Sequence, residues 1–537
     1  MATWTSRLQA NWPTIIPACI LVCLAPLYAE AIRAAGIGMI HDDGVYVVTG
    51  KALAEGRGYR IPSLPDEPLQ TKYPVVLPLF LSLVWRIAPQ FPENQMLLKA
   101  VPALGLLGWG WVTYSFLRNR AKLSASEALW ILTFVALNQW CLLVTSAIMS
   151  ETIFGFFAMA ALAWLAAACD RQGTTKTTLS AALLAGAAYQ TRTMGIALIV
   201  VGIAALAAKR KLKQAAFFAM VTGGIVIAWM LWQSQAGDPH MPVEAYYTAQ
   251  NYRDWNVFSG KFSISQGVGV VLTNAAIISL YPAQWVFSIP LPEGTHYGFL
   301  AVVSIPFWIC LVRGLRRVPS TMYPVSPFIL ASAGTLVLWA WPPLRFLLSV
   351  LPLLLVYAYY GLPQRARAFV PALAVVPGVM VMLFVQNTVS NGVAEFVSTP
   401  WAARAPVAGM QWEHISSVHR WMAEHTDRDT VILANYDPVM YLYSGRKSIR
   451  PFLMHGPGLF YGVNRTLQEK QLDFDRIIQK YNASYIAETG HDERDEPDYY
   501  AILAGLHASG RILLVKEFAP KYRIYKVVAN EQRGKDR

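Results

Sequence analysis

The feature that most constrains this chain is a series of apolar runs that recurs between residues 12 and 388. Many of these runs reach the roughly 17 to 25 residues that an α-helix needs to cross about 30 Å of hydrocarbon. The 537-residue sequence is 55% hydrophobic and only 14% charged, which is too apolar for a soluble protein of this length. The sequence therefore predicts a polytopic α-helical membrane protein.

Short loops rich in Lys and Arg separate the runs and indicate the topology. The basic clusters at residues 118–122, 209–213, 313–317 and 365–367 mark the cytoplasmic side by the positive-inside rule. With the amino terminus inside, eleven spans are predicted, at residues 12–35, 96–117, 127–147, 151–169, 178–191, 194–208, 214–235, 297–313, 323–341, 344–361 and 368–388. The net charge of +13 is spread over these loops, so no nucleic-acid partner is predicted.

Two further apolar stretches, 74–91 and 267–288, would reverse the charge bias if they crossed the membrane. We expect both to lie in the membrane interface or to re-enter it, where they contact membrane lipids. This topology places the loops 36–95 and 236–267 on the outer side, together with the segment that follows the last span. Function is expected there.

The carboxy-terminal part of the chain has a different character. Beyond a transmembrane domain at residues 1–395, the mixed composition of residues 410–537 predicts an α/β domain. Helices are expected at 415–425, 438–444, 467–481 and 499–508, and strands at 430–434, 447–450, 483–487, 512–518 and 522–528. No glycine-rich phosphate-binding turn is present in this part, so no nucleotide site is predicted.

An acidic pair stands directly after the first span, in the sequence His41-Asp42-Asp43-Gly44. Mutual repulsion between adjacent carboxylates raises the proton affinity of at least one of them, which suits a general base or a metal ligand. The alternative is that one of the pair caps a short helix, which is expected over residues 45–54. The pair predicts a catalytic or metal-binding site on the outer side.

Four more charged residues lie at outer turns. Lys72 precedes Pro74 at the start of an interfacial stretch, Glu151 opens a later span, and Arg192 and Arg345 sit at span ends. Each cation has an alternative role as an interfacial anchor. Together, however, these charges match a polyprenyl-phosphate sugar, which needs cations for its phosphate and a base for the acceptor hydroxyl.

At these positions the chain resembles the GT-C superfamily of glycosyltransferases, in particular the branch of bacterial lipid A aminoarabinose transferase and the protein O-mannosyltransferases. The resemblance rests on the acidic pair after the first span, a Lys-x-Pro entry, a Ser-Glu pair opening a later span, and an Arg-Phe-Leu-Leu-x-x-Leu-Pro run. In this chain the four motifs are Asp42/Asp43, Lys72 to Pro74, Ser150/Glu151 and Arg345 to Pro352. Val75 departs from the second proline of many relatives, and Asp-Asp replaces the Asp-Glu that is typical of the mannosyltransferases.

The resemblance implies roles for these residues. Asp42 would be the catalytic base with Asp43 as its alternate, and Glu151 would position the acceptor or the sugar. The donor phosphate would be bound by Lys72, Arg192 and Arg345. The implied reaction transfers a sugar, with inversion, from a polyprenyl-phosphate donor to an envelope lipid, glycan or protein. The implied location is the outer, periplasmic face of a bacterial inner membrane.

Two other functions fit the composition. A transporter or lipid flippase with an accessory outer domain would place charges near the bilayer midplane and repeat a half-structure, and neither pattern is seen in the sequence. A scaffold would leave the outer charges unexplained. A divalent metal ion held by His41, Asp42, Asp43 or Glu151 is an open alternative, because no diagnostic ligand spacing is present.

Overall fold

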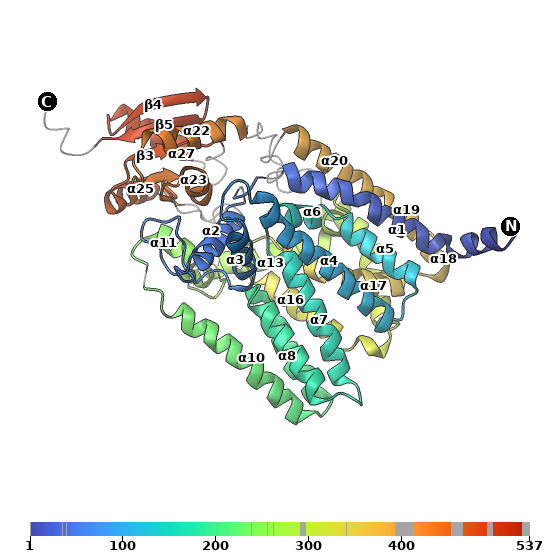
Figure 1. The fold of residues 1–537 in the computed structure, drawn as a ribbon. Helices are drawn as coiled ribbons and strands as arrows, with labels where there is room; N and C mark the ends of the chain where they lie inside the picture. Colours follow the sequence, from blue (N-terminus) through green and yellow to red (C-terminus); the bar gives the residue numbers. More distant parts are fainter. Residues whose placement is uncertain are drawn as a thin grey trace.

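The computed structural model describes residues 2–34, 36–38, 40–237, 239–254, 256–260, 262–289, 297–339, 341–391, 412–452, 465–490 and 498–528. Helices dominate the first part of the chain (Figure 1). The helices up to residue 254 are α1 (Ala2–Ala34), α2 (Asp42–Ala54), α3 (Val76–Ile87), α4 (Gln95–Asn119), α5 (Ala125–Ala136), α6 (Gln139–Ser146), α7 (Glu151–Cys169), α8 (Thr175–Tyr189), η1 (Thr193–Gly195), α9 (Ile196–Ala208), α10 (Leu212–Gln233), α11 (Pro242–Tyr247) and α12 (Gln250–Asp254). They are followed by α13 (Ile264–Leu280), α14 (Pro282–Phe287), α15 (Tyr297–Leu315), η2 (Ser320–Met322), α16 (Val325–Val337), η3 (Leu344–Val350), α17 (Leu351–Gly361), α18 (Gln364–Arg367), α19 (Val370–Leu373) and α20 (Val375–Asn391).

Six stretches of helix in the described residues are long and apolar enough to cross a membrane. They are Thr14–Arg33, Gln95–Asn119, Glu151–Cys169, Leu212–Gln233, Gly298–Leu315 and Leu344–Gly361. The other predicted spans fall on the bent pair α5–α6 or on shorter helices such as α8, α9 and α16, so the count of eleven stays a prediction. Of the two stretches expected in the interface, residues 74–91 contain α3, and residues 267–288 contain most of α13 and all of α14; α3 with its 12 residues is only about 18 Å long.

The predicted span at residues 127–147 is not one helix. It consists of α5 and α6, which meet at an angle of 65°. Asn138 lies at the break, where its side-chain oxygen accepts a hydrogen bond from the Trp140 backbone and its amide donates to the Trp285 carbonyl at 2.8 Å. These bonds start a new helix and anchor it to a distant segment, which a pattern of apolar residues does not reveal.

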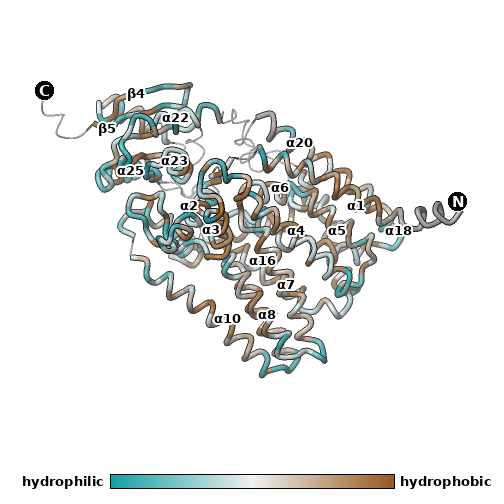
Figure 2. The backbone as a smooth tube through the Cα atoms, in the orientation of Figure 1, coloured by the Kyte–Doolittle hydropathy of each residue, from teal (hydrophilic) through white to brown (hydrophobic). Residues whose placement is uncertain are grey.

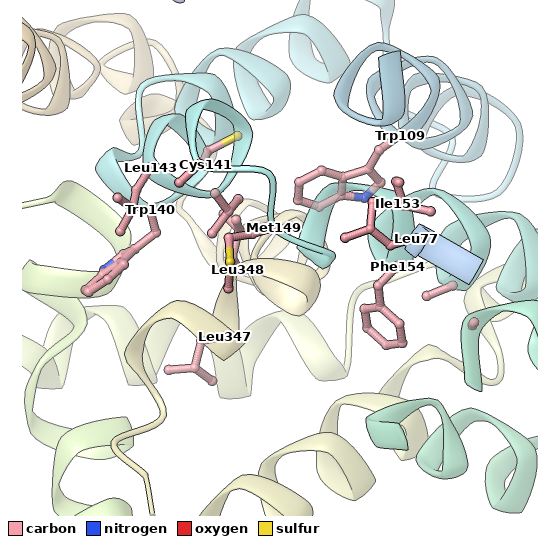
Figure 3. Close-up of a cluster of buried hydrophobic side chains, with 14 of the residues drawn as sticks. Leu77, Trp109, Trp140, Cys141, Leu143, Met149, Ile153, Phe154, Leu347 and Leu348 are labelled. Atoms are coloured by element: carbon pink, nitrogen blue, oxygen red, sulfur yellow. The ribbon is translucent and has the colours of Figure 1, made fainter. Parts of the chain in front are cut away.

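Packing between neighbouring helices holds the bundle together. Helix α7 packs against both α4 and α8, and α1 packs against α5 and α20. Figure 2 shows hydrophobic residues along most of the long helices, while hydrophilic colour concentrates at the loops and in the carboxy-terminal part. Figure 3 shows one buried cluster in which side chains of α3, α4, α6, α7 and η3 gather, including Trp109, Met149 and Leu348. Met149 precedes Ser150 and Glu151 directly, so the cluster fixes the link that carries them.

The carboxy-terminal residues form a five-stranded mixed sheet with helices. The elements are α22 (Trp412–His425), β1 (Ile432–Ala434), α23 (Asp437–Ser444), β2 (Ser448–Ile449), α25 (Leu467–Tyr481), β3 (Tyr485–Ala487), α27 (Tyr499–Ala508), β4 (Ile512–Ala519) and β5 (Tyr522–Val527). The strand order is β2-β1-β3-β5-β4; β1 runs parallel to β2 and β3, while β5 is antiparallel to β3 and β4. Each of the helices and strands expected from the sequence has its counterpart here, with ends shifted by a few residues.

This sheet region, called the carboxy-terminal domain below, lies at the end of the bundle where α2, α3 and α11 are found (Figure 1). Several hydrogen bonds join it to the loop at residues 36–95. The Ser448 backbone N–H donates to the Ser63 carbonyl at 2.8 Å, and the Lys447 ammonium donates to the Pro65 carbonyl at 3.0 Å. The Tyr481 hydroxyl in α25 also donates to Glu244 of the loop at residues 236–267, at 2.8 Å. The domain is thus docked on both loops.

Candidate functional site

The acidic pair opens α2. The helix begins at Asp42, and the residue before it, His41, has no side-chain hydrogen bond to the helix end. Asp42 and Asp43 therefore occupy the first turn, and the alternative in which one of them is the N-cap residue does not hold, because His41 has that position. Carboxylates in the first turn are stabilised by the partial positive charge of the helix amino terminus. Since successive side chains on a helix differ by about 100° in direction, the two carboxylates face different surroundings.

Asp43 faces the backbone of its own loop. Its two oxygens accept hydrogen bonds from the Gly38 N–H at 2.7 Å and the Ile40 N–H at 3.1 Å, and the side chain is fully buried. Burial raises the pKa of Asp43 to about 6, although the backbone donors act in the opposite direction. Both oxygens are thus used to shape the loop, which makes Asp43 a structural residue of the site.

Asp42 faces the cations. One oxygen accepts from the Tyr73 hydroxyl at 2.7 Å, and the other lies 3.3 Å from the Arg345 guanidinium. Burial raises the pKa of Asp42, but Arg345, Lys72 and the Tyr73 hydroxyl outweigh burial and hold it below its usual value. The carboxylate is therefore ionised at neutral pH. It also retains 23% side-chain exposure, so a substrate can reach it.

Glu151 lies between two arginines. Its Oε1 is 2.9 Å from Arg192 and 3.7 Å from Arg345, and its side chain is only 3% exposed. The Arg192 guanidinium also donates to the Ser150 hydroxyl at 2.9 Å. The breaks in the helices explain the placement: Arg192 stands between α8 and η1, Arg345 follows Pro342 and Pro343, and Glu151 is the first residue of α7.

Lys72 completes the group from the first outer loop. Its ammonium lies 3.8 Å from the centre of the Tyr246 ring, and only 5% of the residue is exposed. Burial lowers the pKa of Lys72 to about 7; the carboxylates of Asp42 and Asp437 oppose this decrease, and Arg450 adds to it. An anion that enters the site would stabilise the charged form of Lys72 and so raise its pKa.

The structure thus brings the six residues singled out in the sequence to one end of the bundle. Asp42, Glu151, Arg192 and Arg345 form one connected network of carboxylates and guanidinium groups, with Lys72 within electrostatic range of Asp42. Such a network can bind a phosphate through its cations while Asp42 accepts a proton.

Sequence reasoning missed several participants. Tyr73 was seen only as part of a Lys-x-Pro motif, although its hydroxyl binds the proposed base. Asp437 of the carboxy-terminal domain was not singled out, yet its Oδ1 lies 2.8 Å from His41 Nε2 and accepts a hydrogen bond from the Tyr247 hydroxyl at 2.8 Å.

A metal site was an open alternative from the sequence. Within the part of the chain that the structure describes, no three His, Cys, Asp or Glu side chains gather in a metal-binding arrangement. The residues proposed as ligands are used otherwise: Asp43 binds the loop backbone and His41 binds Asp437.

No protein-family model matches the chain, and no curated protein sequence matches it significantly. Solved structures do match. ArnT from Cupriavidus metallidurans bound to undecaprenyl phosphate has a TM-score of 0.58 at 12% identity, covering 97% of this chain and 98% of ArnT. The archaeal oligosaccharyltransferase AglB from Archaeoglobus fulgidus, in complex with an inhibitory peptide and a dolichol-phosphate, has a TM-score of 0.51 at 13% identity, covering 98% of this chain and 75% of AglB. Both belong to the GT-C superfamily.

This chain has the GT-C fold. The structure of ArnT in the apo state is similar as well, with a TM-score of 0.56 at 11% identity, covering 95% of this chain and 98% of ArnT. The resemblance that the sequence motifs suggested is thereby confirmed at the level of the fold. At these identities the likeness concerns architecture, so any conclusion about the chemistry of this chain rests on its own side chains.

Proposed function

We propose that this protein is a membrane glycosyltransferase that moves a sugar from a polyprenyl-phosphate donor to an acceptor hydroxyl. The observation that carries the proposal is the network in which ionised, partly exposed Asp42 lies beside Arg345, with Lys72 and Arg192 nearby. The bound undecaprenyl phosphate of ArnT and dolichol-phosphate of AglB, proteins of the same fold, support a lipid-phosphate donor.

The proposed reaction is a single displacement. Asp42 accepts the proton of the acceptor hydroxyl, the hydroxyl oxygen forms a bond to the anomeric carbon, and the bond from that carbon to the phosphate oxygen breaks. The electron pair leaves with the polyprenyl phosphate, whose negative charge Lys72 and Arg345 stabilise. A single displacement inverts the anomeric configuration. Glu151 orients the two arginines, and the proposed acceptor is an envelope lipid, glycan or protein.

We further propose that the reaction takes place at the outer face of a bacterial inner membrane, because the positive-inside pattern puts the loop of Asp42 and the carboxy-terminal domain there. Nucleotide sugars are made in the cytoplasm, so an outward site needs a lipid carrier for its sugar. Loops rich in Lys and Arg, such as residues 209–213, lie at the opposite ends of the helices.

The test is sugar transfer by the purified protein in liposomes. Wild type and Asp42→Asn are compared with a panel of radiolabelled polyprenyl-phosphate sugars and membrane acceptors. Loss of the general base is expected to lower the rate by about 10² to 10⁴-fold. Asp66→Asn, an exposed carboxylate of the same loop, is the matched control and should transfer at the wild-type rate. Undiminished activity of Asp42→Asn would reject Asp42 as the base, and no transfer by wild type with any donor would reject the function.

A further inference from the structure

His41, directly before the proposed base, has an unusual backbone conformation. Its φ of 71° and ψ of −54° lie in a region that residues with a side chain rarely occupy. Such a conformation persists only where surrounding contacts fix it, and it is found preferentially at functional sites. The contacts that hold His41 therefore determine how α2 begins, and with it where the Asp42 carboxylate points.

Those contacts come from two distant segments. His41 Nε2 lies 2.8 Å from Asp437 Oδ1 in the carboxy-terminal domain, and Nδ1 lies 3.2 Å from the Tyr246 hydroxyl in α11. The residue is 3% exposed, and burial lowers its pKa, so the imidazole is neutral and carries one N–H. One arrangement gives both ring nitrogens a hydrogen bond: Nε2–H donates to Asp437, and the Tyr246 hydroxyl donates to Nδ1. The Tyr247 hydroxyl donates to the same Asp437 oxygen, Oδ1, at 2.8 Å.

Close packing supports the same link independently. A Cβ added at Gly38, which has a φ of +87°, would lie 2.3 Å from a Val439 methyl carbon. A Cβ added at Gly44 would lie 2.8 Å from Pro438. Both neighbours belong to the first turn of α23, directly after Asp437. The loop that carries the acidic pair is thus pressed against the start of one helix of the carboxy-terminal domain, with no space for a side chain between them.

We propose that the carboxy-terminal domain takes part in the reaction by positioning Asp42 through the His41–Asp437 pair. This inference rests on the proposed function, because it assumes that Asp42 is the base. His41 and Asp437 are positioning residues: they act on Asp42 through the backbone of the loop and need not touch the substrate. A displacement of about 1 Å between reacting groups can lower a rate 10²-fold.

The experiment compares Asp437→Ala, His41→Ala and their double variant in the full-length protein. Each single variant is expected to lower kcat for sugar transfer by about 10 to 100-fold with KM for the donor within about twofold of wild type. Because the two residues act as one unit, the double variant should be no slower than the slower single variant. Asp437→Asn keeps an acceptor oxygen for His41 and Tyr247 and should recover most of the rate.

Asp475→Ala is the matched control, since this aspartate pairs with Arg511 within the carboxy-terminal domain and does not contact the first loop. It should leave kcat unchanged. Wild-type kcat in Asp437→Ala would overturn the proposal. So would effects that multiply in the double variant, or a rise in KM alone, which would indicate direct contact with substrate.

Hydrogen exchange separates this inference from the proposed function. The amides of residues 40–47 should exchange faster in Asp437→Ala than in wild type, and this readout needs no substrate. Faster exchange without any detectable sugar transfer by wild type would leave the mechanical link in place and reject the glycosyltransferase function. Unchanged exchange together with a wild-type rate in the variant would reject the link while the function stands.

Discussion

Lys72 gives the sharpest test of how the site binds its donor. The residue is 5% exposed, its ammonium lies against the Tyr246 ring, and burial lowers its pKa to about 7. For a cationic group with this pKa, the charged fraction is about nine tenths at pH 6, one half at pH 7 and one tenth at pH 8. If the cation holds the donor phosphate, kcat/KM for the donor should fall about tenfold between pH 6 and pH 8.

The direction of this change in kcat/KM depends on which protonation state of Lys72 is active. The charged form of Lys72 binds the anion, and raising the pH through about 7 removes this charge from the free enzyme. The pH dependence of kcat/KM reports the titration of groups in the free enzyme. Asp42 does not contribute a limb in this range, because its pKa lies below its usual value and it stays ionised. The expected profile therefore declines with a slope near −1 above about pH 7.

Two variants complete this experiment. Lys72→Arg keeps a positive charge at every accessible pH, so its alkaline decline should disappear even if its maximal rate is lower. Lys72→Gln should be slow at every pH. The measurement is the initial rate of transfer at limiting donor over roughly pH 6 to pH 9 in liposomes. A flat wild-type profile, or the same alkaline decline in Lys72→Arg, would refute a phosphate-binding role for Lys72.

Three further predictions concern neighbouring residues. Asp43→Asn should cost about 1–3 kcal/mol of stability, because an amide group would point a donor at a buried backbone N–H; thermal unfolding in detergent measures this, and an unchanged melting temperature would contradict it. Glu151→Leu leaves two partly exposed arginines without their shared carboxylate and should cost about 1–3 kcal/mol, less than for a fully buried pair; added polyprenyl phosphate should raise the melting temperature more in this variant than in wild type, and an equal rise would argue against anion binding by the arginines. Gly44→Ala places a Cβ 2.8 Å from Pro438 and should slow transfer. Gly505→Ala, in a helix of the carboxy-terminal domain where the added Cβ meets open space, should not slow it. Equal rates in both variants would show that the close packing has no role.

Much of the local structure was accessible from the sequence. The order of helices and strands between residues 412 and 527 agrees with the alternation of patterns, including the strand at Tyr522–Val527. These elements could be predicted because hydrophobic periodicity and turn residues act over short distances. The six charged residues of the candidate site were also noticeable in the sequence, since an ionisable group at the edge of an apolar run is costly unless it has a function or a partner.

Other features depended on partners far along the chain. The break between α5 and α6 is fixed by Asn138, whose amide binds the carbonyl of Trp285. From the sequence, Asp42 and Asp43 were nearly equivalent, because the repulsion between two adjacent carboxylates does not indicate which of them has the raised proton affinity. Their roles separated only when the helix directed one carboxylate to Arg345 and the other to the loop backbone.

The sequence by itself determined the apolar helices, the order of elements in the carboxy-terminal domain and the charged residues from which the candidate site is built. The tertiary structure decided which of those charges meet and what holds them. Asp437 contacts His41 across a separation of 396 residues. No periodicity or spacing encodes such a pair, because its energy arises only when docking of the domain excludes water and brings two otherwise unremarkable polar groups within hydrogen-bonding distance.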